Sequence, residues 1–170
     1  MDRASFEIVD ATESHLPGIQ AIYNQAVRET FSIWSETETT LDARRTWRQS
    51  RLAAGFPVLA AVDPNAPDMV LGYASYGVFR DFPGYVNTVE HSVYVTPAAH
   101  RHGIGRALLE TLIARANEAG LKAMVGGVDA ANTASIALHE SLGFEVQGCL
   151  KGVGYKFGQP LDLVFMVRQL

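Results

Sequence analysis

Two neighbouring stretches decide the fold of this chain: Thr88-Val89-Glu90-His91-Ser92-Val93-Tyr94-Val95 and His100-Arg101-His102-Gly103-Ile104-Gly105-Arg106. The first is rich in β-branched and aromatic residues, which favour a strand, and Pro97 ends it. The second opens a helix that we expect over about 103–119, because apolar residues recur there at helical spacing. The glycines expose backbone N–H groups of residues 101–106 at the positive end of that helix. This strand–turn–helix unit therefore predicts a binding site for a phosphate or diphosphate.

The glycine spacing of this turn excludes two other phosphate-binding motifs. A Rossmann fingerprint requires a third glycine at position 108, where the chain has Leu108. A P-loop requires Gly-Lys-Ser/Thr after four intervening residues, and the chain has Leu108-Leu109-Glu110 there. Two glycines alone are equally compatible with a tight turn that needs small residues. Further positive charge at the rim comes from Arg101, His102 and Arg106.

Periodicity and turn residues predict the elements on either side of this unit. Helices are expected at 13–28, 42–54 and 133–142, and strands at 6–9, 57–62, 69–79, 122–128, 144–148 and 161–167. Strands joined by short turns pair antiparallel. Strands 88–95 and 122–128 should run parallel, because the helix between them makes a right-handed crossover. The last two strands are expected to form a hairpin across a long loop. The predicted class is α+β, a mixed and mostly antiparallel sheet with helices on both faces.

Composition narrows the possible functions. The chain has 170 residues, which fits one domain over 1–170, and its net charge of -4 argues against bulk nucleic-acid binding. No apolar run approaches the roughly 20 residues that span a bilayer, and the opening MDRASFEIVD lacks the pattern of a signal peptide. Cys149 is the single cysteine, so a reducing, cytoplasmic location is expected. His91, His100 and His102 lack a convincing ligand set, so no metal is expected.

Two motifs resemble those of a known family. His100-x-x-Gly103-x-Gly105 resembles the Gln/Arg-x-x-Gly-x-Gly/Ala signature of the GNAT acetyltransferase superfamily, and residues 132–144 resemble its second motif. Position 100 departs from the signature, which puts one side-chain contact in doubt but not a site built mostly from backbone. A closer resemblance is to the phosphinothricin / methionine sulfoximine acetyltransferase group, through residues 21–24, 33–37, 72–77, 88–95, 156–158 and 161–163.

The resemblance implies acetyl-CoA as the acetyl donor and co-substrate. It also implies a GNAT-like sheet in which the fourth and fifth strands, 88–95 and 122–128, form a parallel, splayed pair. Backbone groups of the fourth strand would hold the pantetheine arm, amides of the glycine turn would hold the diphosphate, and the last helix would contact the cofactor. The implied cofactor-binding residues are Val93, Tyr94, Val95, His100, Arg101, His102, Gly103, Ile104, Gly105, Arg106, Asn132 and Ser135.

For acetyl transfer to an amine, the predicted catalytic residues are Glu90, Ser92 and His139. Strand alternation puts Glu90 and Ser92 on one face, where Glu90 can take the proton of an ammonium group, directly or through a water. Ser92 can orient the amine or that water, and a strand N–H near residues 93–95 can stabilise the developing oxyanion. His139 occupies the position where many of these enzymes have a tyrosine that protonates the leaving thiolate. The alternatives are a salt-bridging role for Glu90 and a purely structural role for His139.

The predicted acceptor-binding residues are Trp34, Arg80 and Phe82, together with Glu90 and Ser92. Related enzymes use the Arg–x–Phe segment for an amino-acid substrate, and Arg80 can hold a carboxylate bidentately. The alternatives are an exposed loop charge for Arg80 and a core position for Trp34. Arg44, Arg48 and Arg51 fall on one face of the second helix, and we expect that face to be solvated rather than to bind a ligand.

The function expected from these features is N-acetylation of a small amino-acid-like amine of the phosphinothricin, methionine sulfoximine or methionine sulfone type. A protein N-terminus or a polyamine remains an alternative acceptor, and a non-catalytic acyl-CoA-binding module is an alternative class. A homodimer is expected by analogy with related proteins. The residues expected to be exposed and suited to that contact are Phe31, Ile33 and Trp34.

Overall fold

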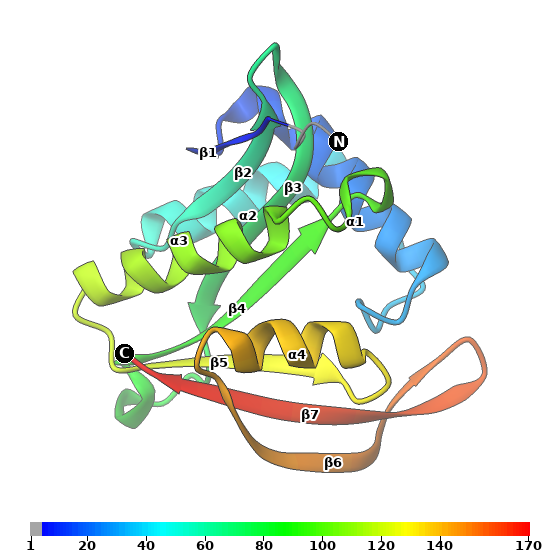
Figure 1. The fold of residues 1–170 in the computed structure, drawn as a ribbon, viewed down its shortest axis with the longest axis vertical. Helices are drawn as coiled ribbons and strands as arrows, with labels where there is room; N and C mark the ends of the chain where they lie inside the picture. The colour runs from blue at the N-terminus through cyan, green and yellow to red at the C-terminus, as the bar shows by residue number, and fades with distance from the viewer. Residues whose placement is uncertain (1–4) are drawn as a thin grey trace.

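The computed structural model describes residues 5–170; residues 1–4 of the expected domain lie outside the described part. Seven strands form one sheet in the order β1-β2-β3-β4-β5-β7-β6 (Figure 1). The strands are β1 (Glu7–Asp10), β2 (Val58–Asp63), β3 (Ala66–Val78), β4 (Thr88–Val95), β5 (Ala123–Asp129), β6 (Glu145–Lys156) and β7 (Gln159–Gln169). The α-helices are α1 (Leu16–Glu29), α2 (Leu41–Ala53), α3 (Ile104–Glu118) and α4 (Thr133–Ser141). Short 3₁₀ helices occupy Glu13–His15 (η1), Pro83–Tyr85 (η2) and Pro97–Ala99 (η3).

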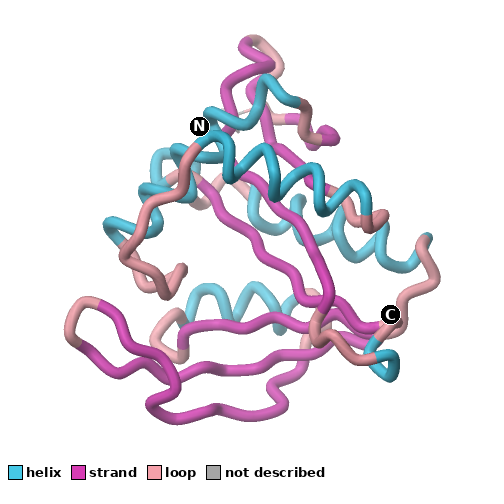
Figure 2. The backbone as a smooth tube through the Cα atoms, turned by 180° about the vertical axis from the view of Figure 1, so that it is seen from behind, coloured by secondary structure: helices cyan, strands magenta, loops and turns pink. Residues whose placement is uncertain are grey.

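All neighbouring strands pair antiparallel except β4 and β5, which pair parallel as predicted. The parallel ladder is short: it joins Thr88 to Ala123, Val89 to Met124 and Glu90 to Val125. Beyond Glu90 the two strands diverge, and Figure 1 shows β4 running toward the start of α3 while β5 stays beside α4. The backbone seen from behind shows the same separation (Figure 2).

The helices cover both faces of the sheet, as expected. On one face, α1 packs Leu16 and Ile19 against Ala60 and Tyr73. On the other face, α3 buries apolar residues against Ala74 and Tyr76 of β3, among them Leu108, Leu109 and Leu112. Side chains of β3 and β4 therefore alternate between two cores, which fixes the strand register strongly. Among residues 5–170, no helix has the length and apolar character that a membrane span requires.

The sequence-based boundaries differ from the structure mainly in the last hairpin. The expected long loop is wrong: β6 and β7 are joined by the two residues Phe157 and Gly158, and β6 extends to Lys156. Register shifts between Val146 and Gly148 and between Leu150 and Gly154 interrupt the ladder, so the residues of β6 do not alternate regularly. The predicted first helix is divided into η1 and α1, and β3 begins at Ala66, inside the expected turn.

Lys156 fastens this hairpin to the end of α1. Its side chain is fully buried, and its ammonium group donates hydrogen bonds to the carbonyls of Thr30 at 2.6 Å and Ile33 at 2.7 Å. Cations near a helix C-terminus are favoured by the helix dipole, and a longer contact of 3.4 Å reaches the Ala26 carbonyl. The expectation that Ile33 is exposed is therefore wrong, because it is buried in the core around the end of α1. Trp34, the next residue, is held against β6.

Candidate active site

The turn between β4 and α3 has the backbone geometry of an anion site. Gly103 is the N-cap of α3 with a φ of 85°, and Arg101 has a φ of 65°. No side chain caps this helix, so the first N–H groups of α3 keep no intrahelical partner. His100 lies 3.0 Å from the Val95 carbonyl through its Nε2, which ties the turn back to β4. Residues 101–106 therefore present free amides at the end of β4.

Of the predicted rim charges, Arg106 is already engaged within the protein. Its guanidinium pairs with Glu110 at 3.1 Å and donates to the Ser141 hydroxyl at 2.7 Å, which links α3 to α4. Arg101 and His102 are exposed beside the turn. The positive character of the site thus comes from backbone amides and Arg101 more than from Arg106.

Glu90 lies where the two parallel strands separate. It belongs to the last β4–β5 pair, and its Oε1 lies 3.3 Å from the point where a Cβ of Gly127 would stand on β5. Burial is the largest influence on its carboxyl group and raises the pKa of Glu90, while the charges of Arg80 and then Arg51 act in the opposite direction. A raised pKa gives a carboxylate more affinity for a proton, which suits a proton acceptor.

The alternation predicted for β4 matches the way its side chains divide between the two cores. Tyr94 packs in the α1 core, on the face of Glu90 and Ser92, whereas Val93 and Val95 pack in the α3 core. Ser92 lies opposite Ser75 in the β3–β4 ladder.

His91 and His139 form a buried pair on the α3 side of the sheet, which the sequence did not reveal. Their Nε2 atoms lie 3.1 Å apart and their rings stack with centroids 5.0 Å apart. His139 Nδ1 lies 2.6 Å from the Ser135 carbonyl, so its N–H donates there and its Nε2 accepts from His91. His91 Nδ1 is left without a hydrogen-bond partner within residues 5–170.

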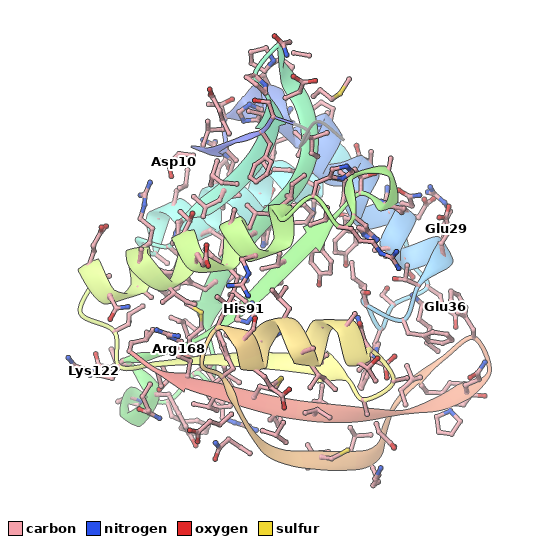
Figure 3. The ribbon with its side chains drawn as sticks, viewed as in Figure 1. Asp10, Glu29, Glu36, His91, Lys122 and Arg168 are labelled. Carbon is pink, nitrogen blue, oxygen red and sulfur yellow. The ribbon has the colours of Figure 1, made fainter. Side chains whose placement is uncertain are left out.

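The hydrogen bonds of this pair bear on the predicted role of His139 as the acid that protonates the leaving thiolate. Burial lowers the pKa of both imidazoles, that of His91 to about 3, so the pair is neutral at neutral pH. His139 lies across the sheet from Glu90, with both ring nitrogens in hydrogen bonds. Figure 3 shows His91 between α3 and α4, the helices that flank the diverging strands. A proton donor here has to break one of these contacts first.

The predicted acceptor residues do not all converge. The Arg80 guanidinium lies 5.3 Å from the ring centroid of Phe79, close enough to Glu90 to act on its charge. Phe82 is 69% exposed, so it does not by itself form the wall of an enclosed acceptor pocket. Trp34 packs on β6, where a Cβ at Gly154 would stand 2.2 Å from its ring.

The arginines of α2 do not form the solvated face expected from the sequence. The Arg44 guanidinium lies 4.4 Å from the centroid of the Tyr23 ring, and Arg48 Nε donates to the Ala11 carbonyl at 2.7 Å. Arg51 acts on the charge of Glu90. These side chains lie between α2 and the sheet, because α2 carries no apolar residue that is fully buried and the arginine stems fill the space.

The two predicted contacts from the second motif meet at the start of α4. The Asn132 side-chain oxygen accepts a hydrogen bond from the Ser135 backbone N–H at 3.1 Å and caps the helix. The amide NH₂ of Asn132 and the hydroxyl of Ser135 are the groups that remain for a ligand.

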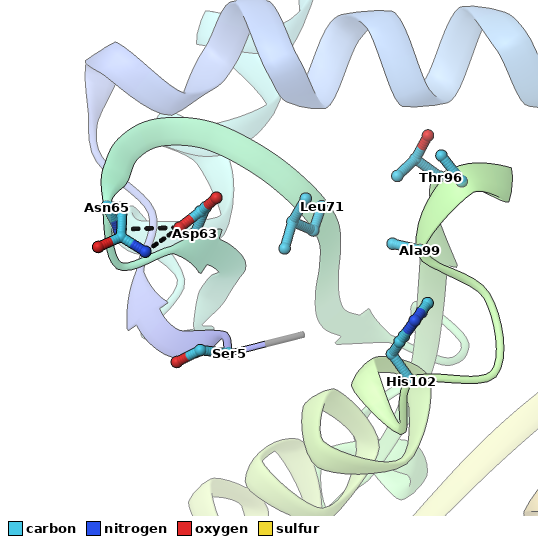
Figure 4. Close-up of a pocket in the computed structure, with 8 residues that line it drawn as sticks. Ser5, Asp63, Asn65, Leu71, Thr96, Ala99 and His102 are labelled. Atoms are coloured by element: carbon cyan, nitrogen blue, oxygen red, sulfur yellow. Dashed lines mark hydrogen bonds between the residues drawn. The ribbon is translucent and has the colours of Figure 1, made fainter. Parts of the chain in front are cut away.

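A pocket of about 250 Å³ lies at the far end of β3 from Glu90 (Figure 4). Leu71 in its wall accepts the backbone hydrogen bond of Thr96, whereas Glu90 faces Gly77, six residues further along β3. The lining residues are Ser5, Asp63, Asn65, Leu71, Thr96, Ala98, Ala99 and His102. Residues 5–170 hold no group of three or more His, Cys, Asp or Glu side chains placed for a metal ion.

Comparison with known proteins identifies the class. Residues 19–144 match the Acetyltransferase (GNAT) family. The chain is 50% identical over 166 residues to L-methionine sulfoximine/L-methionine sulfone acetyltransferase of Pseudomonas aeruginosa, covering 98% of this chain and 95% of that protein. It is 39% identical to phosphinothricin N-acetyltransferase of Alcaligenes faecalis, covering 93% and 79%. The yncA protein of Salmonella typhimurium, solved with its cofactor acetyl-CoA, superimposes with a TM-score of 0.92 at 44% identity, covering 97% and 94%. The chain belongs to the GNAT acetyltransferase family.

Removing His91 should make the protein less sensitive to acid. Its pKa is about 3 in the folded state against 6.5 for the free imidazole, so between these values the unfolded chain binds more protons and stability falls as pH falls. From pH 7 to pH 5 this amounts to about 2 kcal/mol. Between pH 7 and pH 5, the unfolding free energy of His91→Leu should therefore fall by about 2 kcal/mol less than that of the parent protein. Urea unfolding at both pH values measures this difference. Equal losses would contradict a neutral buried pair.

Proposed function

We propose that this protein transfers the acetyl group of acetyl-CoA to the amine of a small amino-acid-like molecule. The observation that carries the proposal is the position of Glu90 at the separation of β4 and β5, at the opposite end of β4 from the uncapped amides of α3. One strand length therefore joins the proposed diphosphate site to a half-buried proton acceptor. The whole chain, 1–170, would act as one domain.

The residues around this opening fit acetyl-CoA. From His91 to Val95, β4 has no partner on the β5 side, so its backbone groups are available to the amides of a pantetheine arm. Just beyond the last β4–β5 pair, β5 has Gly126 and Gly127, which carry no side chains. Amides of residues 101–106 would hold the diphosphate, and Asn132 and Ser135 would contact the cofactor from α4. The cofactor supplies an activated acetyl thioester.

The chain's own groups would manage the protons of the reaction. Glu90 takes a proton from the acceptor ammonium, directly or through a water, which frees the nitrogen lone pair. A C–N bond then forms at the acetyl carbonyl carbon and the C–S bond breaks. Ser92, on the same face, orients the amine or the water. The thiolate that leaves takes its proton from water or, after release of a hydrogen bond, from His139.

The names of the relatives support an amino-acid analogue as acceptor, of the methionine sulfoximine, methionine sulfone or phosphinothricin type. Arg80, beside Glu90, would bind the acceptor carboxylate, with Trp34 and Phe82 as apolar contacts. A protein N-terminus and a polyamine are the competing acceptors. A panel of such amines, with thiol release from acetyl-CoA as the readout, separates these classes. A protein that releases no thiol with any amine of the panel would be a binding module.

We further infer a homodimer in the cytoplasm. Strand β6 is the outer strand of the sheet and is exposed over nearly its whole length. It carries exposed apolar side chains, and an unpaired edge of this kind favours association with a second copy. The residues are Val146, Leu150, Val153 and Tyr155. Cys149, on the same strand, is a free exposed thiol, which suits a reducing compartment.

Glu90→Gln should remove the proton acceptor while keeping the shape of the side chain. We expect kcat/KM for the best amine of the panel to fall by about 10²–10⁴ with little change in acetyl-CoA affinity. Thiol release across pH 6–9 and calorimetric titration with acetyl-CoA measure the two quantities. Full activity of the variant over that range would remove Glu90 from the chemistry.

The two glycines of the turn should respond differently to alanine. Gly103 has a φ of 85°, where a Cβ costs about 1–2 kcal/mol, so Gly103→Ala should distort the turn and weaken acetyl-CoA binding by about tenfold. At Gly105 a Cβ would make ordinary contacts of 3.7 Å with Leu138 and Val95, so Gly105→Ala should bind nearly as the parent does. Calorimetry with acetyl-CoA compares the pair, and equal affinities would argue against the amide site.

The proposed dimer is tested at the β6 edge. Each chain has a mass of 18.5 kDa, so light scattering after size-exclusion chromatography should give twice that value. Leu150→Asp places a charge on the exposed apolar strand and should shift the protein toward monomer. A monomeric parent protein would refute the dimer, and a variant that stays dimeric would move the interface elsewhere.

A further inference from the structure

The guanidinium of Arg51 fills the space on the sheet that a side chain at Gly77 would take. Gly77 of β3 lies directly opposite Glu90 of β4 in the antiparallel ladder, so a side chain at position 77 would stand on the same face beside the Glu90 side chain. Gly77 has none, and Nη1 of Arg51 lies 1.3 Å from where its Cβ would be. The guanidinium of a helix residue thus stands in the place of the cross-strand neighbour of Glu90.

That neighbour position brings the positive charge of Arg51 near the carboxylate of Glu90. Side chains directly opposite in an antiparallel pair have Cβ atoms about 4.5–5.5 Å apart. Arg51 and Glu90 act on each other's charge, although no direct ion pair joins them in the part of the chain that the structure describes. Arg51 Nε is buried and has no hydrogen-bond partner there, so the guanidinium is not committed elsewhere through that atom.

The other charged or titratable groups around Glu90 come from different elements. Arg80 approaches from the segment between β3 and η2 and has the larger influence of the two arginines. Tyr94 lies on the same face of β4, two residues beyond Ser92. Burial and then the charge of Arg44, on the same face of α2, lower the pKa of Arg51, whereas the charge of Glu90 raises it. Arg51 is therefore one of two cations that offset the burial of Glu90, and it alone comes from a helix packed over the sheet.

We propose that Arg51 is a positioning residue for Glu90: it takes the cross-strand place that Gly77 leaves empty, and its charge favours the ionised form of the half-buried carboxylate that is directed at β5. Gly77 is glycine, on this account, because any side chain would expel the guanidinium. The expected effect of Arg51 on catalysis rests on the proposed function of Glu90. The expected effect of Arg51 on the ionisation of the Glu90 carboxyl group is independent of that function.

The first test reads that carboxyl group without any reaction. The protein is labelled with ¹³C at glutamate carboxyl carbons, the Glu90 signal is assigned by its loss in Glu90→Gln, and its titration is followed by NMR. Neutralising Arg51 in Arg51→Gln removes a nearby positive charge, so the Glu90 midpoint should move to higher pH. Arg51→Lys, which keeps the charge, should restore most of the shift. A midpoint that is the same in all three proteins would overturn the proposal.

Gly77→Ala tests the geometry with every charge retained. The new Cβ meets only the far end of a flexible side chain, so the guanidinium should move away and the fold should persist. The Glu90 midpoint should then rise as in Arg51→Gln. Gly148→Ala, at a strand position with nothing within 4 Å, and Arg45→Gln, on the exposed side of α2, are the matched controls and should leave the midpoint unchanged. Equal shifts in variant and control would overturn the proposal.

Activity adds a second readout, and it separates this inference from the proposed function. Arg51→Gln should lose kcat/KM relative to the parent more strongly at low pH than at high pH, because its Glu90 midpoint lies at higher pH. If Glu90→Gln is inactive and Arg51→Gln keeps the parent pH profile, Arg51 has no positioning role. If Glu90→Gln is fully active, Glu90 has no catalytic role, whatever the NMR titration gives, and if the parent protein acetylates no amine of the panel, the proposed function fails.

Discussion

The parallel pairing of β4 and β5 stops after three residue pairs, and the proposed active site depends on this interruption. Had the ladder continued, the backbone groups of β4 from His91 to Val95 that point toward β5 would have had partners in that strand. Polar backbone groups are rarely left unpaired away from water, so such an edge in the middle of a sheet requires a ligand or solvent. The amides at the start of α3 impose the same requirement a few residues further along the chain. Both sets of groups follow from one strand–turn–helix unit.

Glycines inside strands mark the places where other side chains enter this opening. A Cβ at Gly126 would stand 3.0 Å from His91 Nε2, and one at Gly127 would stand 3.3 Å from the Glu90 carboxylate. The two positions face opposite sides of β5, since neighbouring strand residues alternate. One therefore accommodates the imidazole pair and the other the carboxylate of Glu90. Gly77 does the same for Arg51. A glycine inside a strand often marks a place where another group approaches the backbone closely. In this sheet, the glycines make room for different side chains on the two faces.

Much of the fold could be predicted from sequence because the signals are local. The bounds of β4 agree residue for residue, since its β-branched run is ended by Pro97. The β6–β7 hairpin could not be predicted, because bulges and glycines in residues 147–154 remove the period of two. For the same reason, Glu90 and Ser92 follow from strand alternation, whereas the His91–His139 contact spans 48 residues and leaves no local pattern. The arginines of α2 show their spacing in the sequence, but not the aromatic rings on which they pack.

The environment of Glu90 balances two needs that oppose each other. Excluding water strengthens the interactions of a reacting amine, but the same burial disfavours the charged form of the carboxylate that is proposed to accept its proton. A direct salt bridge would restore the charge and at the same time weaken the proton affinity that a base requires. Arg80 and Arg51 instead act on Glu90 from nearby without forming an ion pair in the described residues. A half-buried carboxylate with two cations at a distance retains its affinity for a proton while part of the cost of its charge is offset, and that combination suits the role proposed for Glu90 in amine acetylation.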